Sequence, residues 1–203
     1  MGEQIFREMR CSSMREDRNI INEQWVERYN KQPDEIKKEI DNKVLHQLHV
    51  IKRKRVFPQK GDVFLVNPVD GVYFYGLVLN AGVKNIHAED ELYVVAIFKK
   101  RIKSLEDYDK DFIPDFNQLL IRIAIVGREY WTRGFFYNVT TYNYQKEKTY
   151  GFFSVGKFIY YDEFGNELSY VPELVGIWGV STIIGIAGKI QTELIIDKTL
   201  LTV

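Results

Sequence analysis

The sequence has a single cysteine, Cys11, among its 203 residues. One thiol cannot form an internal disulfide. The first residues carry charges from Glu3 onward and contain no apolar stretch of the kind that a secretory signal peptide requires. We therefore expect no signal peptide and a reducing, cytoplasmic location.

The sequence also lacks an excess of charge of either sign. Lys and Arg together number 28, Asp and Glu together number 28, and the formal net charge is +0. Proteins that bind nucleic acids by bulk electrostatics are strongly basic, and proteins that mimic DNA are strongly acidic. The balance argues against both classes.

No apolar run is suited to crossing a membrane. The longest candidate, residues 171–188, is broken by Pro172 and Glu173 and contains several glycines and alanines. A membrane span needs about 20 mostly apolar residues without such breaks. We therefore predict no membrane partner.

Catalytic and cofactor-binding motifs are missing as well. The sequence has no P-loop, no dinucleotide-binding fingerprint and no nucleophile elbow. His46 and His49 could share one face of a predicted helix, but a zinc site needs three or four ligands and His87 lies in a distant loop. Cys11 lies in a polar leader with no base positioned beside it. We predict no enzyme, no metal and no cofactor, and an unrecognised hydrolase stays open as an alternative.

The strongest pattern that is present is a hairpin between residues 61 and 79. Two apolar runs, residues 63–66 and 72–79, flank a loop that contains Pro68 and Gly71, both typical of turns. Side chains of both parities are apolar, whereas a sheet with one wet face would alternate. One parity comprises Phe64, Val66, Phe74 and Val78, and the other comprises Val63, Leu65, Tyr73, Tyr75 and Leu77. The hairpin is therefore predicted to be a central wall covered on both sides, with a bulge or close backbone approach at Gly76.

Residues 1–56 differ in composition from residues 57–203, because they are rich in charge and poor in aromatic side chains. Ile21, Trp25 and Tyr29 recur every fourth residue, as on one stripe of a helix, and a second helix start is predicted at Pro33. The second stripe consists of Ile36, Ile40, Val44, Leu48 and Ile51. We predict a helical N-terminal segment, residues 1–56, packed on an antiparallel β domain, residues 57–203.

Short β-rich runs fill most of the remaining chain. The predicted strands are residues 92–98, 119–126, 134–142, 150–155, 157–161, 167–171 and 194–196. A Gly165-Asn166 turn predicts a second hairpin. Residues 172–190 are ambiguous, because helical spacing of the apolar residues competes with several glycines. The fold class is therefore α+β, mostly β, with an antiparallel barrel or two packed sheets and the helical segment at the N-terminus.

The segment 105–116 mixes acidic and aromatic side chains. Phe112 and Phe116 could plug the end of a barrel while the acids stay in water, or the segment could form a recognition surface for a basic protein. For the second case the candidate partner-binding residues are Glu106, Asp107, Tyr108, Asp109 and Asp111. Tyr108 would be the anchor and the four acids would supply charge.

Residues 56–137 resemble the bacterial immunity protein 26 family. The resemblance is carried by Gly61-Asp-Val-Phe-Leu-Val and by Asp70-Gly-Val-Tyr-Phe-Tyr-Gly-Leu-Val-Leu79, with shorter similarities at residues 113–116 and 134–136. It implies an immunity protein that binds a cognate protein toxin stoichiometrically and neutralises it, with no catalytic residue. The toxin, its activity and the oligomeric state are not specified by the sequence.

A basic run, residues 52–55, supports one further alternative. Lys52-Arg-Lys-Arg55 could bind phosphate groups together with exposed tyrosines, as in a nucleic-acid-associated β-barrel. The other interpretation is a solvated helix end, where cations complement the helix dipole.

Overall fold

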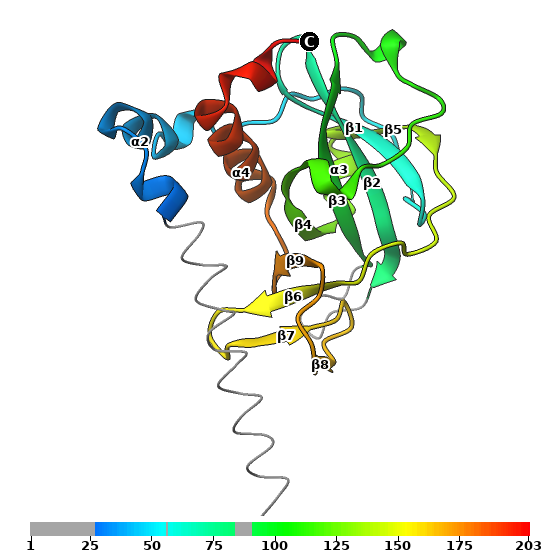
Figure 1. The fold of residues 1–203 in the computed structure, drawn as a ribbon. Coiled ribbons are helices and arrows are strands. Elements are labelled where there is room, and N and C mark those ends of the chain that lie inside the picture. The colour runs from blue at the N-terminus through cyan, green and yellow to red at the C-terminus, as the bar shows by residue number, and fades with distance from the viewer. Residues whose placement is uncertain (1–26, 56, 84–90) are drawn as a thin grey trace, which may run out of the picture.

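The computed structural model describes residues 27–55, 57–83 and 91–203. Within them, nine strands form two sheets beside a small group of helices (Figure 1). The first sheet, in the order β4-β3-β2-β1-β5, contains β1 (Asp62–Val69), β2 (Val72–Val83), β3 (Leu92–Ile102), β4 (Leu119–Gly127) and β5 (Phe136–Thr141). The second, in the order β8-β7-β6-β9, contains β6 (Tyr150–Ser154), β7 (Ile159–Tyr161), β8 (Glu167–Leu168) and β9 (Leu174–Ile177). The structure thus confirms a mostly β fold made of two sheets.

Helices connect and cover these sheets. The α-helices are α2 (Asp34–Ile40), α3 (Glu129–Thr132) and α4 (Ile183–Ile196), and residues 27–30 are also helical. The 3-10 turns are η1 (Lys43–Leu45), η2 (Leu105–Asp107), η3 (Phe116–Gln118) and η4 (Lys198–Leu201). The division of the chain at residue 56 stays a prediction.

The β1–β2 hairpin is the central wall that its two apolar parities predict. Phe64 and Phe74 lie in one buried cluster, while Leu65 and Tyr75 lie in a second cluster on the opposite face. A Cβ added to Gly76 would overlap the ring of Phe64, and the β2–β3 register shifts beside it. The irregularity expected at Gly76 is therefore present as a register shift, but the close approach is made by the side-chain ring of Phe64 and not by backbone.

The start of β1 is fixed by Gly61 and Asp62. Gly61 has φ +90°, and a Cβ there would overlap the backbone carbonyl of Tyr142. The Asp62 carboxylate accepts a hydrogen bond from Asn138 Nδ2 at 2.6 Å, and Asn138 Oδ1 accepts one from Trp131 Nε1 at 2.7 Å. Desolvation raises the pKa of Asp62 above its usual value. These two residues secure β1 against β5 and the aromatic core.

The second sheet contains one parallel strand pair, whereas the pairs of the first sheet are antiparallel. β7 and β8 pair antiparallel across a turn in which Gly165 has φ +88°, which confirms the second hairpin in a shorter form. β6 and β9, in contrast, pair in parallel. β9 also packs on β4, where a Cβ on Gly176 would meet the carbonyl oxygen of Ile123.

The prediction of a strand at residues 194–196 is wrong, because these residues end α4. Thr182 Oγ1 accepts a hydrogen bond from Gly185 N–H at 3.1 Å and so caps the helix. A Cβ on Gly188 would lie 2.9 Å from His46 Nδ1, so a small residue is needed there. The buried side chains of α4 that complete the first core cluster are Ile186, Ala187, Ile190 and Leu194. Burial of this face overrides the low helix propensity of its glycines.

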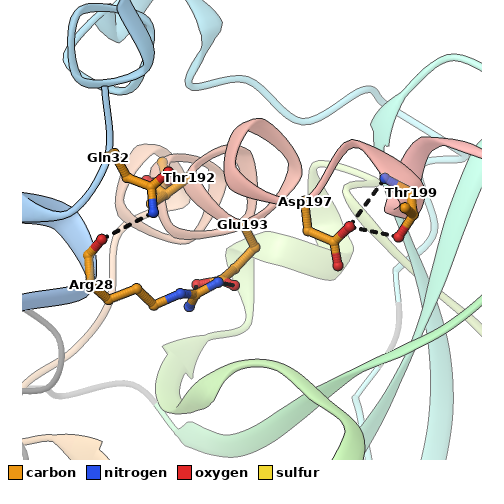
Figure 2. A network of polar contacts seen from close by, with 7 residues as sticks. Arg28, Gln32, Thr192, Glu193, Asp197 and Thr199 are labelled. Carbon is orange, nitrogen blue, oxygen red and sulfur yellow. Dashed lines mark hydrogen bonds and ion pairs between the residues drawn. The ribbon is translucent and has the colours of Figure 1, made fainter. Parts of the chain in front are cut away.

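The N-terminal elements pack on α4. The guanidinium of Arg28 donates to both carboxylate oxygens of Glu193 at 2.8 Å, and Gln32 Nε2 donates to the Arg28 carbonyl at 3.1 Å (Figure 2). Figure 2 also shows the end of α4, where Asp197 Oδ1 accepts hydrogen bonds from the backbone and hydroxyl of Thr199.

The second predicted helical stripe does not continue past Ile40. α2 ends there, Val44 within the short η1 turn is 72% exposed, and Leu48 is buried without a helix around it. The residues Cys11, Ile21, Trp25 and His87 lie outside the described part of the chain.

Candidate functional site

The acidic and aromatic segment forms most of the connection between β3 and β4, residues 103–118. It is an ordered loop with two short capped turns. Ser104 Oγ accepts a hydrogen bond from Glu106 N–H at 3.2 Å, and Asp115 Oδ1 accepts one from Asn117 N–H at 2.9 Å. Side-chain caps of this kind hold a loop without a regular helix.

The aromatic residues of the connection face the core. Phe112 and Phe116 are both buried in the second cluster. The ring of Phe112 stacks on Tyr75 of β2, with 4.5 Å between centroids and 5° between planes, and meets Phe98 of β3 edge-on at 5.6 Å. The interpretation that these two phenylalanines fill the core is therefore supported.

Asp109 ties the connection to the central strand. Its backbone N–H donates to the hydroxyl of Tyr75 at 2.6 Å, and its carboxylate lies 2.7 Å from Lys100 Nζ. The hydrogen bond from Lys100, and then the one from Asp111 N–H, lower the pKa of Asp109, while burial raises the pKa of Tyr75. Lys100 Nζ also lies over the rings of Tyr75 and Phe112, 5.6 and 5.3 Å from their centroids. Asp109 is therefore a supporting residue whose charge is already paired.

The other acids point into solvent. Glu106, Asp107 and Asp111 are exposed and, within the described residues, form no ion pair; we call these three the acidic face. A hydrogen bond from the Ser104 hydroxyl lowers the pKa of Glu106. Tyr108 is half-buried and packs against the second core cluster. The structure therefore brings the five predicted residues together on one connection and gives them different roles.

A shallow groove of about 350 Å³ lies beside the acidic face, between the end of β3 and residues 112–118. Its walls include Lys99 and Arg101 of β3, and Ile113, which is 73% exposed. Ile113 precedes Pro114, which favours an extended backbone at that position. Neither Ile113 nor Lys100 was predicted as part of the site. The connection must first fold back along the end of β3 before Ile113 and Asp109 lie beside Lys100.

The two histidines that the structure describes each make one close polar contact. His46 Nε2 lies 3.1 Å from the carbonyl oxygen of Ile40, and His49 Nδ1 lies 2.7 Å from the Asp70 carboxylate. Among the residues that the structure describes, no group of three or more His, Cys, Asp or Glu side chains could hold a metal ion. In the same residues, no helix combines the length and apolar character that crossing a membrane requires.

The basic run at residues 52–55 is exposed and has no regular secondary structure. The interpretation of the run as a helix end is therefore wrong. The chain there runs beside the end of α3, where Ile51 N–H donates to the carbonyl of Gly134 at 2.8 Å.

Comparison with known proteins gives one match. A family model described as immunity protein 26 matches residues 59–160, which include the β1–β2 hairpin, the whole 103–118 connection and the second sheet as far as β7. The match extends beyond residue 137, where the motif resemblance ended. Neither the curated proteins nor the solved structures gave a match. Since the matched region is half of the 203 residues, the chain belongs to the immunity protein 26 family.

Proposed function

We propose that this immunity protein neutralises a cognate protein toxin by binding it stoichiometrically in the bacterial cytoplasm, without catalysing a reaction. The observation that carries the proposal is the family match over residues 59–160. A preformed surface favours affinity in stoichiometric binding, and the 103–118 connection, which is held by the Tyr75 hydroxyl and two capped turns, supplies a candidate.

The proposed contact surface is the acidic face with Tyr108 beside it. Glu106, Asp107 and Asp111 would meet basic side chains of the toxin, and complementary charges of this kind raise the association rate and select the partner. Tyr108 offers an aromatic anchor of the kind that is enriched in binding hot spots.

Asp109 would act by holding the surface in shape. Its links to Tyr75 and Lys100 fix the connection on the sheet before the partner arrives. A connection that is already ordered loses less conformational entropy on binding, which favours affinity.

The function is tested with the product of the neighbouring gene. We expect that product to arrest bacterial growth when expressed alone, growth to recover when this protein is co-expressed, and the two proteins to co-purify in a fixed molar ratio. Growth arrest without rescue, or rescue without a complex, would contradict neutralisation by binding.

A further inference from the structure

A second charged surface is found around the backbone contact between residues 51–55 and the end of α3. It gathers six cations from two segments that are far apart in the sequence. The basic patch consists of Lys52, Arg53, Lys54, Arg55, Arg128 and Arg133. The hydrogen bond from Ile51 N–H to Gly134 and the close approach of Gly134 to the backbone of Lys52 and Arg53 place Arg133 beside the run.

The cations of the basic patch have no carboxylate partners among the described residues. Within the part of the chain that the structure describes, none of the six lies within 4.0 Å of an acidic oxygen. The nearest acid along α3, Glu129, has its carboxylate against Gly127 instead. Zero net charge for the whole chain therefore coexists with a local concentration of positive charge, which attracts polyanions.

An exposed aromatic ring lies next to these charges. Phe57 is 56% exposed, and the guanidinium carbon of Arg128 lies 4.6 Å from its ring centroid. Proteins that bind single strands combine cations that follow the phosphate backbone with aromatic rings on which bases stack. The run itself is irregular, so it presents no helix that could enter the major groove of a duplex.

We infer that the basic patch and Phe57 form a binding site for single-stranded nucleic acid, independent of the toxin-binding surface. Phosphates would contact the Lys and Arg side chains, and one base would stack on the free face of Phe57. Binding would be tolerant of sequence, because phosphate contacts and stacking on an aromatic ring are available to every base.

The test uses the full chain with fluorescein-labelled dT20 and rU20 in anisotropy titrations between 20 and 200 mM NaCl. We expect micromolar binding at low salt and a steep fall with salt, with a slope of about −0.7 in log K against log [NaCl] per phosphate contacted. Absence of binding at 20 mM NaCl to both oligonucleotides overturns the inference. Binding of only one of them supports it, and a further titration with dU20 then shows whether the sugar or the C5-methyl group of the base is recognised.

Two variants locate the site. Lys54→Glu/Arg55→Glu should weaken binding at least about tenfold and flatten the salt dependence, because two phosphate contacts are lost. The control Lys38→Glu/Lys103→Glu changes the net charge equally at two exposed lysines that are far from the patch in sequence and form no ion pair in the described residues. An equal loss in the control would show non-specific attraction and overturn the inference.

Phe57→Ala distinguishes nucleic acid from any polyanion. We expect it to weaken dT20 binding by about tenfold, with recovery in Phe57→Trp, and to leave heparin binding unchanged. Equal binding of heparin and oligonucleotide by the natural chain, with no effect of Phe57→Ala on either, would overturn the assignment to nucleic acid.

Discussion

The β1–β2 hairpin and the 103–118 connection both bury aromatic side chains, but they use their acids in different ways. In the hairpin, the family motif is used for architecture: Gly61 admits the backbone of Tyr142, and Asp62 holds Asn138. In the connection, Phe112 and Phe116 are buried while Glu106, Asp107, Asp111 and Asp115 are exposed. Gly61 and Asp62 thus hold the core in place, and the connection that this core supports is where we propose the contact surface.

The largest effect on stability is expected at Gly61. Gly61→Ala would force a Cβ into a backbone carbonyl that cannot move aside, at a φ that disfavours side chains. We expect a loss of about 3 kcal/mol in the free energy of unfolding, measured by urea denaturation. Gly156→Ala is the matched control, since no atom lies within 4 Å of its Cβ position. A similar loss in the free energy of unfolding there would contradict an architectural role of the motif.

Reversing charge on the acidic face should damage binding without damaging the fold. Asp107→Lys/Asp111→Lys places like charges against a basic partner, and we expect toxin affinity to fall at least about tenfold in calorimetry. The melting temperature should stay within a few degrees of the parent protein, because both side chains are exposed.

The matched control for this pair is Glu35→Lys/Glu167→Lys, which makes the same charge change at two exposed acids on α2 and β8. An equal loss of toxin affinity in this control would show that net charge, and not the acidic face, governs binding.

Tyr75→Phe should loosen the attachment of the 103–118 connection to the hairpin. The change removes the hydroxyl that accepts the Asp109 N–H and keeps the ring that stacks on Phe112. We expect a loss of about 1–2 kcal/mol in the free energy of unfolding and faster hydrogen exchange at residues 105–111. Unchanged exchange there would show that stacking alone holds the connection.

The smallest effect concerns pH. Because the folded-state pKa of Asp109 is lowered from the usual 3.8, its contribution to stability is fully present above that value and is lost as pH falls through the folded-state pKa. Melting temperatures between pH 5 and pH 2 should therefore fall less steeply in Asp109→Asn than in the parent protein. If the melting temperatures of the parent protein and of Asp109→Asn fell equally steeply with pH, the pairing of Asp109 with Lys100 would not contribute to stability.

Much of the first sheet could be predicted from the sequence, because strands that are buried on both faces carry apolar residues at successive positions. Phe64 and Leu65 are neighbours in the chain and lie in different core clusters, as their alternating positions indicated. Helix α4 could not be predicted, because Gly185 and Gly188 argue against a helix until His46 is known to lie against one of them. Local preference was overridden there by packing between distant segments.

The sequence indicated which segment mixes acidic and aromatic side chains, but it did not indicate how each of those side chains is held. Mixing acids with aromatics pointed to residues 105–116, yet nothing in that pattern distinguishes Asp109 from Asp107. The distinction depends on Lys100 and Tyr75, which approach Asp109 only when β2 and β3 are paired. Ile113 was missed for a similar reason, because its exposed position on the wall of the groove depends on the path that the folded connection takes.

The sequence separation between α4 and the hairpin that it covers has a consequence for the order of folding. The buried face of α4 completes the cluster around Phe64, and Gln191 Nε2 donates a hydrogen bond to the carbonyl of Pro68 across 123 residues of sequence. Contacts of such long range form slowly, and these cannot form until α4 has been synthesised. A nascent chain can therefore form its β1–β2 hairpin before the helix that covers one face of it exists. Until α4 docks, the aromatic side chains around Phe64 form an exposed apolar surface, and this is the stage of folding at which the chain is most exposed to aggregation.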